Sequence, residues 1–423
     1  MTSLKTSLHA WHTGHGARMG LFGGYDMPLW YASAKDEHLA VLNHAGIFDT
    51  SHMAVVLVEG PGALDLLQFC FTNDLTACLG PRKASLRPGR AVYGAFLDAQ
   101  GHVVDDAIVF MLAADAFMVV VNAGMGPAVA AHLVQHGGAY AARVTDLSGQ
   151  VGKMDVQGPM AARMLYDVLA EPETVFDAMP YFSFKGGFTD AIPSWGAVVT
   201  RQGVPLLLSR TGYTGEFGFE LFAGPEQIVA LWEAIVAAGA SLGAVPCGLA
   251  ARDSLRAGAG LPLSHQDIGA WPFCRHPWPF ALPYRPGTQE FSKPFLGDTA
   301  LQTCQGPYTY PFIGRDLRKV TLPAEVLDAS GRSIGDVLTC VTDMAVGRHE
   351  GRVFSIRSPD RPKDFRGGGL CCGFVRVADP LPLDAPLALK DKRRRIDVRI
   401  VKDIRPDRTA RQPIHTLLQP KEE

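Results

Sequence analysis

Along the first half of the chain, apolar and polar positions repeat a pattern of strand, glycine–proline turn and amphipathic helix. An apolar strand at residues 54–58 runs into Gly60-Pro61, and another at residues 151–156 runs into Gly158-Pro159, 98 residues later. Each turn is followed by apolar residues spaced three and four apart, as on the buried face of a helix. These positions are Ala63, Leu66 and Leu67 in the first unit and Ala161, Met164 and Leu165 in the second.

The remainder of each unit repeats in the same way. A strand precedes Gly126-Pro127, and another precedes Gly224-Pro225 and an amphipathic helix, with the same offset of 98 residues. That helix carries Ile228, Leu231, Trp232 and Ile235 on one face. The pattern predicts two like subdomains of the split β-α-β type that face each other. The offset pairs Asn122 with Glu220, each at the end of its strand, so we expect both side chains to line one ligand site.

The segment at residues 210–220, RTGYTGEFGFE, is the most distinctive in the chain. Its three glycines free the backbone for tight turns and for close approach to a ligand. In the strand that leaves this turn, Phe219 and Leu221 share one face while Glu220 lies on the other. We expect the carboxylate to face a cavity and the apolar residues to face a core. A glycine-rich hairpin with a solvated glutamate is the alternative interpretation.

Two further segments place charged side chains beside apolar ones. Asp105-Asp106 precedes an apolar strand at residues 107–111. Adjacent strand residues point to opposite faces, so one carboxylate can be buried and the other solvated. The pair either meets a cationic or N–H-rich ligand or simply ends a hairpin. A helix expected at residues 250–261 puts Arg252 and Arg256 on one face, where arginine either binds a ligand with paired acceptors or is a surface charge.

The last third of the chain has a different character. Residues 270–285 are rich in proline and aromatic residues, which predicts a loop. Residues 311–402 show short strands separated by turns, which is typical of a small antiparallel barrel or sandwich. The basic run KDKRRR at residues 390–395 is explained either as a solvated surface or as a local attraction for an anionic partner.

Composition narrows the class of protein. The chain has 423 residues, which is too long for one compact core and predicts two or three domains. It is 47% hydrophobic and 19% charged, with a net charge of −2 that gives no general attraction to nucleic acid or membranes. Eight cysteines in such a chain do not predict a disulfide scaffold, and we expect Cys371-Cys372 to be buried thiols. We see no signal or membrane-spanning segment and expect a cytoplasmic protein.

The candidate residues together describe a cleft between the two subdomains. It is lined by the carboxylates of Asp106 and Glu220, the amide of Asn122, the phenol of Tyr213 and the guanidinium of Arg252. Buried carboxylates accept paired hydrogen bonds from the N–H groups of a pterin or purine ring. The sequence contains no phosphate-binding loop and no serine nucleophile elbow. The H-x-x-H-x-x-H run near the N-terminus is a weak metal signal because steps of three drift around a helix, and we expect no metal.

Five segments, in chain order, resemble the aminomethyltransferase (glycine cleavage T protein) family. They are residues 6–31, 46–53 (GIFDTSHM), 101–109 (GHVVDDAIV), 210–220 and 248–267 (GLAARDSLRAGAGLPLSHQD). The resemblance implies an α+β fold with three domains in a cloverleaf: two ferredoxin-like repeat subdomains around a central cleft and a C-terminal antiparallel β-barrel. Applied to this chain, the domains are 1–54 with 148–245, then 55–147 with 246–305, and finally 306–412.

The resemblance also implies an activity. Members of the family take an aminomethyl group from the lipoyl carrier protein of the glycine cleavage system, release ammonia and form methylenetetrahydrofolate. Asp106 matches the catalytic aspartate of the family, which positions the folate amine and stabilises developing positive charge. The matches to its folate-binding residues are Glu220, Arg252, Asn122 and Tyr213, and Tyr284 stands where the family has a tryptophan.

The C-terminal third departs from the family pattern. Pro279 replaces an acid near Tyr284, Met118 replaces a tyrosine, and residues 321–327 (TLPAEVL) replace the segment whose arginine holds the folate tail. An insertion around residues 344–366 lengthens the barrel. These changes keep two alternatives open: a folate-dependent demethylase or methyltransferase with another small amine, ether or sulfonium donor, and a folate-binding protein without catalytic activity.

Overall fold

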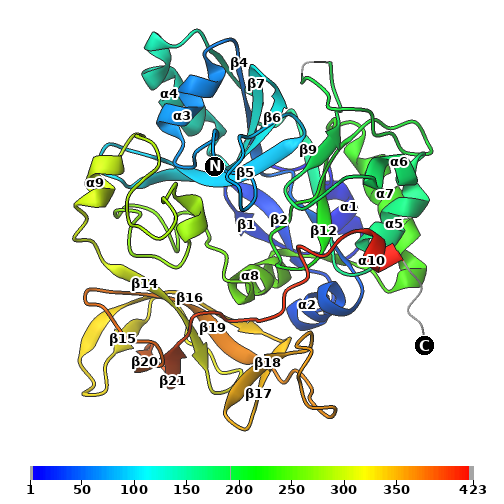
Figure 1. Cartoon of the computed structure of the whole chain (residues 1–423). Helices are drawn as coiled ribbons and strands as arrows, with labels where there is room; N and C mark the ends of the chain where they lie inside the picture. The colour runs from blue at the N-terminus through cyan, green and yellow to red at the C-terminus, as the bar shows by residue number, and fades with distance from the viewer. Residues whose placement is uncertain (1–2, 191, 419–423) are drawn as a thin grey trace.

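Two sheets of corresponding strand order, the second of which has one additional strand, β3, form the first two lobes of the molecule (Figure 1). The structure, a computed structural model, describes residues 3–190 and 192–418. The strands of one sheet are, in order, β5 (Arg90–Leu97), β6 (Val103–Ala113), β7 (Ala116–Val121), β4 (Ala54–Glu59) and β8 (Arg143–Asp146). Those of the other are β10 (Phe184–Gly186), β11 (Leu207–Ser209), β12 (Gly218–Ala223), β9 (Gly152–Gln157), β3 (Gly46–Asp49) and β13 (Val245–Cys247).

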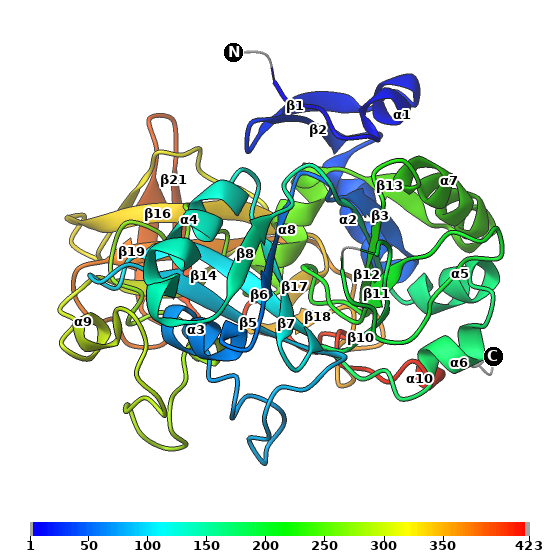
Figure 2. The same ribbon diagram turned by 90° about the horizontal axis from the view of Figure 1, so that it is seen from above.

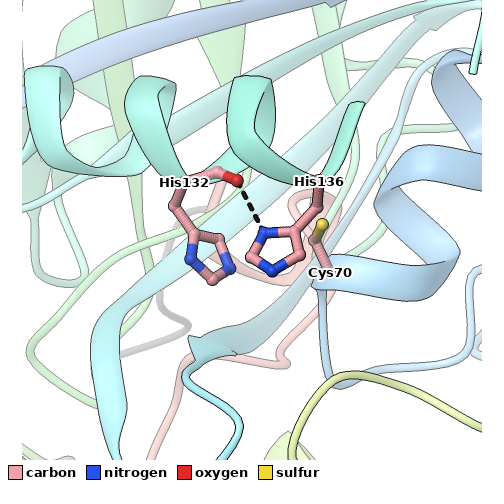
Figure 3. Close-up of side chains that lie close together, drawn as sticks. All are labelled: Cys70, His132 and His136. Carbon is pink, nitrogen blue, oxygen red and sulfur yellow. Dashed lines mark hydrogen bonds between the residues drawn. The ribbon is translucent and has the colours of Figure 1, made fainter. Parts of the chain in front are cut away.

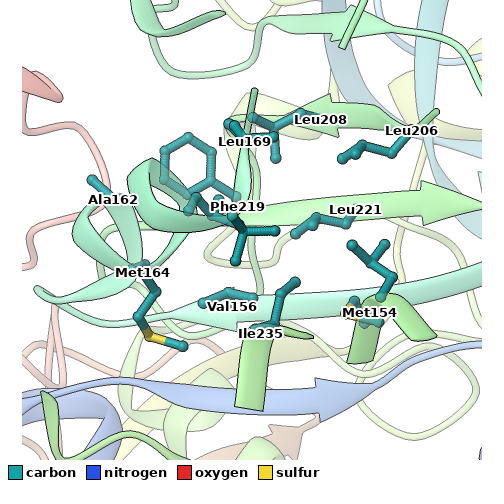
Figure 4. Packing of buried hydrophobic residues seen from close by; sticks show 14 of the residues in the cluster. Met154, Val156, Ala162, Met164, Leu169, Leu206, Leu208, Phe219, Leu221 and Ile235 are labelled. Atoms are coloured by element: carbon teal, nitrogen blue, oxygen red, sulfur yellow. The ribbon is translucent and has the colours of Figure 1, made fainter. Parts of the chain in front are cut away.

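Each sheet has a pair of helices on one face, which the sequence pattern predicted. Helices α3 (Ala63–Cys70) and α4 (Gly126–His136) pack on the first sheet, and α5 (Ala161–Val168) and α7 (Ile228–Gly239) pack on the second. The apolar residues expected on these helices are all buried. Phe219 and Leu221 pack beside Met154, Val156 and Ile235 (Figure 4). The other faces of the two sheets meet in a further apolar cluster that joins, for example, Phe110 and Phe222.

The internal repeat is confirmed, but its offset changes along the unit. β4 and β9 begin 98 residues apart, and so do α3 and α5. β7 and β12 begin 102 residues apart, and so do α4 and α7. The offset of 98 residues between the glycine–proline pairs is not the offset between the elements, because Gly126 is the first residue of α4, whereas Gly224 lies four residues before α7.

This shift corrects two predictions about strand ends. Glu220 is the third residue of β12 rather than its last, so it does not correspond to Asn122, which follows the end of β7. Asp105 and Asp106 lie inside β6 instead of before it. The ladder with β5 extends through both aspartates, pairing Asp105 with Phe96 and Asp106 with Ala95.

The C-terminal lobe is a closed antiparallel barrel, as expected. Its strands are β14 (Tyr308–Gly314), β19 (Leu370–Val377), β16 (Ser333–Asp343), β15 (Glu325–Leu327), β20 (Pro386–Lys390) and β21 (Arg395–Ile400). The expected insertion forms a separate hairpin of β17 (Val346–His349) and β18 (Arg352–Ser355). The three lobes therefore confirm the α+β fold class, while the residue limits of the three domains stay a prediction.

Shorter elements connect the lobes. The N-terminal segment forms α1 (His9–Gly14), the hairpin of β1 (Arg18–Phe22) and β2 (Tyr25–Trp30), and α2 (Ala34–Asn43), and the hairpin stands at one edge of the molecule (Figure 2). The remaining helices are α6 (Pro172–Phe176), α8 (Leu249–Gly258), α9 (Asp298–Gln302) and α10 (His415–Leu418). Within the described part of the chain, no helix combines the length and the apolar character needed to cross a membrane. A cytoplasmic location stays a prediction.

The cysteines are mostly free. Cys371 and Cys372 are buried thiols, as expected, and the Cys371 sulfur lies 3.4 Å from that of Cys340. A disulfide joins Cys274 to Cys304, from the proline-rich loop to the segment after α9. The sequence did not predict this bond, because a pair separated by 30 residues carries no spacing signal.

A buried arginine joins the barrel to the lobe of the second sheet. Arg405, in the tail that follows the barrel, is 1% exposed and donates to Asp343 of β16 at 2.8 Å. It also lies 3.4 Å from Glu216, in the turn before β12, and donates to the carbonyl oxygen of Thr214. Asp343 in turn contacts His38 of α2 at 3.0 Å. Charges withdrawn from water need such partners, because an unpaired buried charge costs several kcal/mol.

We predict that Arg405→Ala lowers the free energy of unfolding by about 3–5 kcal/mol, because it leaves Asp343 and Glu216 buried without their cation. Urea denaturation measures the change. Arg318→Ala is the matched control, since Arg318 pairs with Asp316 on the exposed surface of the same lobe, and we expect no measurable change. Equal urea midpoints for the two variants would show that Arg405 does not hold the barrel and the lobe of the second sheet together.

Candidate functional site

Two adjacent aspartates and an asparagine form the first part of the site. Asp105 is fully buried, and Asp106 keeps partial exposure. The side-chain amide of Asn122, just beyond β7, donates to Asp105 at 2.8 Å and to Asp106 at 2.5 Å. The hydroxyl of Tyr93 on β5 donates to the other oxygen of Asp106 at 2.7 Å. The neighbouring strands thus hold the partly exposed carboxylate of Asp106 in a fixed orientation.

The protonation of Asp106 is shifted by this setting. Burial and then the negative charge of Asp105 raise the pKa of Asp106 to about 6, although the hydrogen bonds from Tyr93 and Asn122 lower it. Asp105 also accepts from Ser264 at 2.8 Å. His265 lies 3.5 Å from Asp105, and its hydrogen bond to that carboxylate raises the pKa of His265. A carboxyl group with a pKa near neutrality is suited to proton transfer or to stabilising positive charge.

The second part of the site is a buried ionic network on the other sheet. Lys153 of β9 donates to Asp155 at 2.7 Å and to Glu220 of the neighbouring strand β12 at 2.8 Å. Arg252 of α8 donates to the second oxygen of Asp155 at 2.5 Å. Thr211 donates to the remaining oxygen of Glu220. All four charged residues are buried, and the two cations neutralise the two carboxylates.

Asp155 and Asp106 show how the surroundings separate two carboxylates. Burial alone would raise the pKa of Asp155, but the adjacent Lys153 and Arg252 lower it to about 2. Asp106 has a like charge beside it in place of two cations, and its pKa rises. Asp155 is therefore a fixed anion, whereas Asp106 is the carboxylate that can exchange a proton near neutral pH.

Tyr213 lies between the two parts. The guanidinium carbon of Arg252 lies 4.9 Å from the centre of the Tyr213 ring. Burial raises the pKa of the Tyr213 hydroxyl, which also responds to the charges of Arg256, Asp106 and Arg252. This hydroxyl donates to the carbonyl oxygen of Pro262. Tyr213 therefore contacts the ionic network of one sheet directly and lies near enough to Asp106 of the other for that charge to act on its pKa.

Five of the six residues singled out from the sequence fall into two contacting groups. Asp106 contacts Asn122, while Arg252 contacts Tyr213 and joins Glu220 through Asp155 and Lys153. The ring of Tyr284 lies tilted against Phe291, with the ring centres 5.1 Å apart, and no described contact links Tyr284 to the other five. Four residues of the site were not predicted from the sequence, namely Lys153, Asp155, Ser264 and His265, and neither were the hydrogen bonds of Asp105 to Asn122 and Ser264. The signal for the first two was polar residues alternating with Met154 and Val156 in an otherwise buried strand.

His52, beside the ionic network, has a nitrogen that is unpartnered within the described chain, which indicates ligand binding. His52 is buried, and its Nδ1 has no hydrogen-bond partner among the described residues. Burial lowers the pKa of His52 to about 4, and the nearby charges include Asp49, Arg252 and Lys153. The ring also contacts Phe22 and Tyr25. An orphaned imidazole nitrogen, aromatic faces and a partly exposed carboxylate fit a flat heterocycle with several N–H groups.

A separate hollow lies on the outside of the barrel. It has a volume of about 500 Å³ and is lined by four arginines, Arg315, Arg348, Arg395 and Arg399, together with Asp328 and Asp397. Arg395 ends the basic run identified in the sequence. The interpretation of that run as attraction for an anionic partner stays a prediction.

Comparisons with known proteins show the family to which the chain is similar. The family model described as "GCVT N-terminal domain" matches residues 8–271. A protein from Streptomyces coelicolor named aminomethyltransferase is 39% identical over 264 residues, which are 62% of this chain and 65% of that protein, just under two thirds of its length. One of the same name from Geobacillus kaustophilus is 36% identical over 341 residues, or 79% of this chain and 85% of the relative.

The fold similarity extends over almost the whole chain. The crystal structure of glycine cleavage system aminomethyltransferase T from Bartonella henselae superposes with a TM-score of 0.72 at 27% identity. The match covers 95% of this chain and 97% of the other. Because the family model spans more than half of the chain and the Geobacillus relative is matched over most of its length, the chain belongs to the aminomethyltransferase family of glycine cleavage T proteins.

Proposed function

We propose that this protein is a tetrahydrofolate-dependent aminomethyltransferase. It takes the aminomethyl group from the lipoyl carrier protein of the glycine cleavage system, passes the carbon to tetrahydrofolate and releases ammonia. The observation that carries the proposal is the partly exposed carboxylate of Asp106, held by Tyr93 and Asn122. The family membership and the fold similarity over nearly the entire chain support it.

The residues of the site have distinct roles in this proposal. Two bonds of the transferred carbon break, one to the carrier sulfur and one to the amino nitrogen, and two bonds form to nitrogens of tetrahydrofolate. The two N–H protons that folate loses leave with the sulfur as a thiol and with the nitrogen as ammonia. Asp106, ionised, orients the folate amine and stabilises the positive charge that develops on the transferred carbon. Tyr213 and Asn122 lie beside the pterin ring, and Arg252 and Glu220 supply polar groups that bind it. These assignments, with that of Tyr284, rest on the family resemblance and the contacts described above.

The ionic network refines the role of Glu220. Its two carboxylate oxygens already accept hydrogen bonds from Lys153 and Thr211. A carboxylate has about four lone-pair sites, so each oxygen can accept one further N–H group. Glu220 therefore binds a ligand as part of a prearranged cluster, and the side chains do not need to be reordered when the ligand enters.

We predict that Asp106→Asn lowers kcat by about 10²–10³ with little change in folate affinity, because it removes an electrostatic contact made mainly in the transition state. Single-turnover kinetics with carrier-bound substrate measure the rate. Asp115→Asn, the same substitution at an exposed aspartate before β7, is the control and retains full activity. A kcat of Asp106→Asn equal to that of the control would exclude Asp106 from the reaction.

The pH dependence tests the surroundings of Asp106. Since the proposal requires its ionised form, activity is high above pH 6 and falls as the pH drops through the pKa of about 6. Tyr93→Phe removes a hydrogen bond to the ionised form, so it moves this acid limb to higher pH. Asp105→Asn removes the neighbouring negative charge and moves the limb to lower pH. Shifts in the same direction for both variants would contradict this account.

Folate binding is tested by calorimetric titration of tetrahydrofolate under anaerobic conditions. We expect the wild type to bind and Glu220→Ala to bind about 10–100-fold more weakly, as for loss of a hydrogen bond to a charged group. Tyr284→Ala, tested in parallel, decides whether that side chain contacts folate. Failure of the wild type to bind folate would overturn the proposed function.

The donor is the least constrained part of the proposal, since the C-terminal third departs from the family. The same kinetics with the carrier omitted, and with small amine, ether or sulfonium donors added, separate the alternatives. Ammonia release that depends on the aminomethyl-lipoyl carrier supports the aminomethyltransferase. Folate methylation from a free donor would instead support a demethylase on the same site.

A further inference from the structure

A cysteine and two histidines meet at the ends of two helices, away from the site described above. Cys70 is the last residue of α3, and His132 and His136 lie one turn apart on the same side of α4. One potential ligand atom from each residue lies within 4.8 Å of the other two (Figure 3). The proposed aminomethyl transfer uses none of these side chains.

One hydrogen bond fixes the tautomer of His136, and one buried nitrogen of His132 lacks a partner among the described residues. Nδ1 of His136 lies 2.9 Å from the carbonyl oxygen of His132. A carbonyl only accepts, so the hydrogen resides on Nδ1 and the lone pair on Nε2. This is the second-shell arrangement that orients histidines bound to metals. Nε2 of His132 is buried and has no hydrogen-bond partner among the described residues, a state that costs free energy unless a ligand is bound.

The spacing is close to that of a tetrahedral site. With Zn–S bonds of about 2.3 Å and Zn–N bonds of about 2.0–2.1 Å, ligand atoms lie about 3.3–3.6 Å apart. The cluster must therefore contract by about 1.3 Å at its widest, which rotation of the side chains supplies. Both histidines are partly exposed, so an ion can enter from solvent. The nearby ammonium of Lys293 donates to the carbonyl oxygens of Gln68 and Phe71 and leaves the thiol free.

We propose that Cys70, His132 and His136 bind one zinc ion, with water as the fourth ligand. A thiolate and two imidazoles form the mixed sulfur and nitrogen set that this ion prefers. The thiol transfers its proton to solvent as the sulfur–zinc bond forms. The ion would connect the ends of α3 and α4, two helices that otherwise meet through apolar contacts on the first sheet.

Titration of the tag-free, chelator-treated full chain with Zn²⁺ tests this site. We expect one tight equivalent, and a loss of affinity of at least about 100-fold in Cys70→Ser and in His136→Gln, since removing a ligand costs at least as much as removing its second-shell partner. Co²⁺ in place of Zn²⁺ shows a thiolate charge-transfer band in the wild type, absent in Cys70→Ser. Zinc also raises the unfolding temperature of the wild type only.

Two controls make the outcome decisive. Cys78→Ser changes a free cysteine, and His15→Gln an exposed histidine, outside the cluster; both keep the affinity of the wild type. Circular dichroism shows whether each variant is folded. If Cys70→Ser does not fold, His136→Gln provides the test, because His136 is partly exposed and its replacement disturbs packing less. Wild-type affinity no higher than that of His136→Gln, or a Co²⁺ complex without the charge-transfer band, would overturn the zinc site.

Discussion

Pairing of buried charges is the constraint on which the rest of the structure depends. A carboxylate withdrawn from water needs a cation or several hydrogen bonds, because desolvation otherwise costs several kcal/mol. Arg405 meets this need for Asp343 and Glu216, which come from the barrel and from the turn before β12. Lys153 and Arg252 meet it for Asp155 and Glu220. The lobes therefore have one relative arrangement in which these charges are paired.

The candidate site contains a place where the pairing of buried charges is incomplete. Asp105 and Asp106 lie side by side on β6, and their hydrogen bonds come from neutral groups, while the nearby His265 is exposed to solvent. The protonated form of Asp106 thus persists to a higher pH than that of an ordinary aspartate. The paired charges of the ionic network on the opposite sheet stay ionised. The candidate site therefore combines one carboxylate that changes its protonation near neutral pH with a set of fixed charges. That combination suits a reaction in which positive charge appears only transiently.

The sequence indicated the repeat better than it indicated the pairing of its parts. Helical spacing found every buried position named on α3, α5 and α7. Counting between glycine–proline pairs failed in the second half, because a proline is equally compatible with the first turn of a helix and with the turn before it. Asn122 and Glu220 were consequently matched to each other, although the residue of β7 at the position of Glu220 is Met118. Asn122 contacts Asp105 and Asp106, whereas Glu220 contacts Lys153 and Thr211, and their lining of one ligand site stays a prediction.

From local periodicity and short motifs, the sequence by itself predicted the repeated elements, a C-terminal barrel or sandwich and the candidate site residues, and the family resemblance supplied the α+β class and the barrel. Tertiary structure alone decided which charges meet. In the ionic network, Lys153, Asp155 and Glu220 come from two strands, and Arg252 comes from a helix about 100 residues after Lys153. Likewise, Cys70 approaches His132 and His136 only when two helices pack on one sheet. Contacts between distant segments depend on register and packing, which no local pattern records.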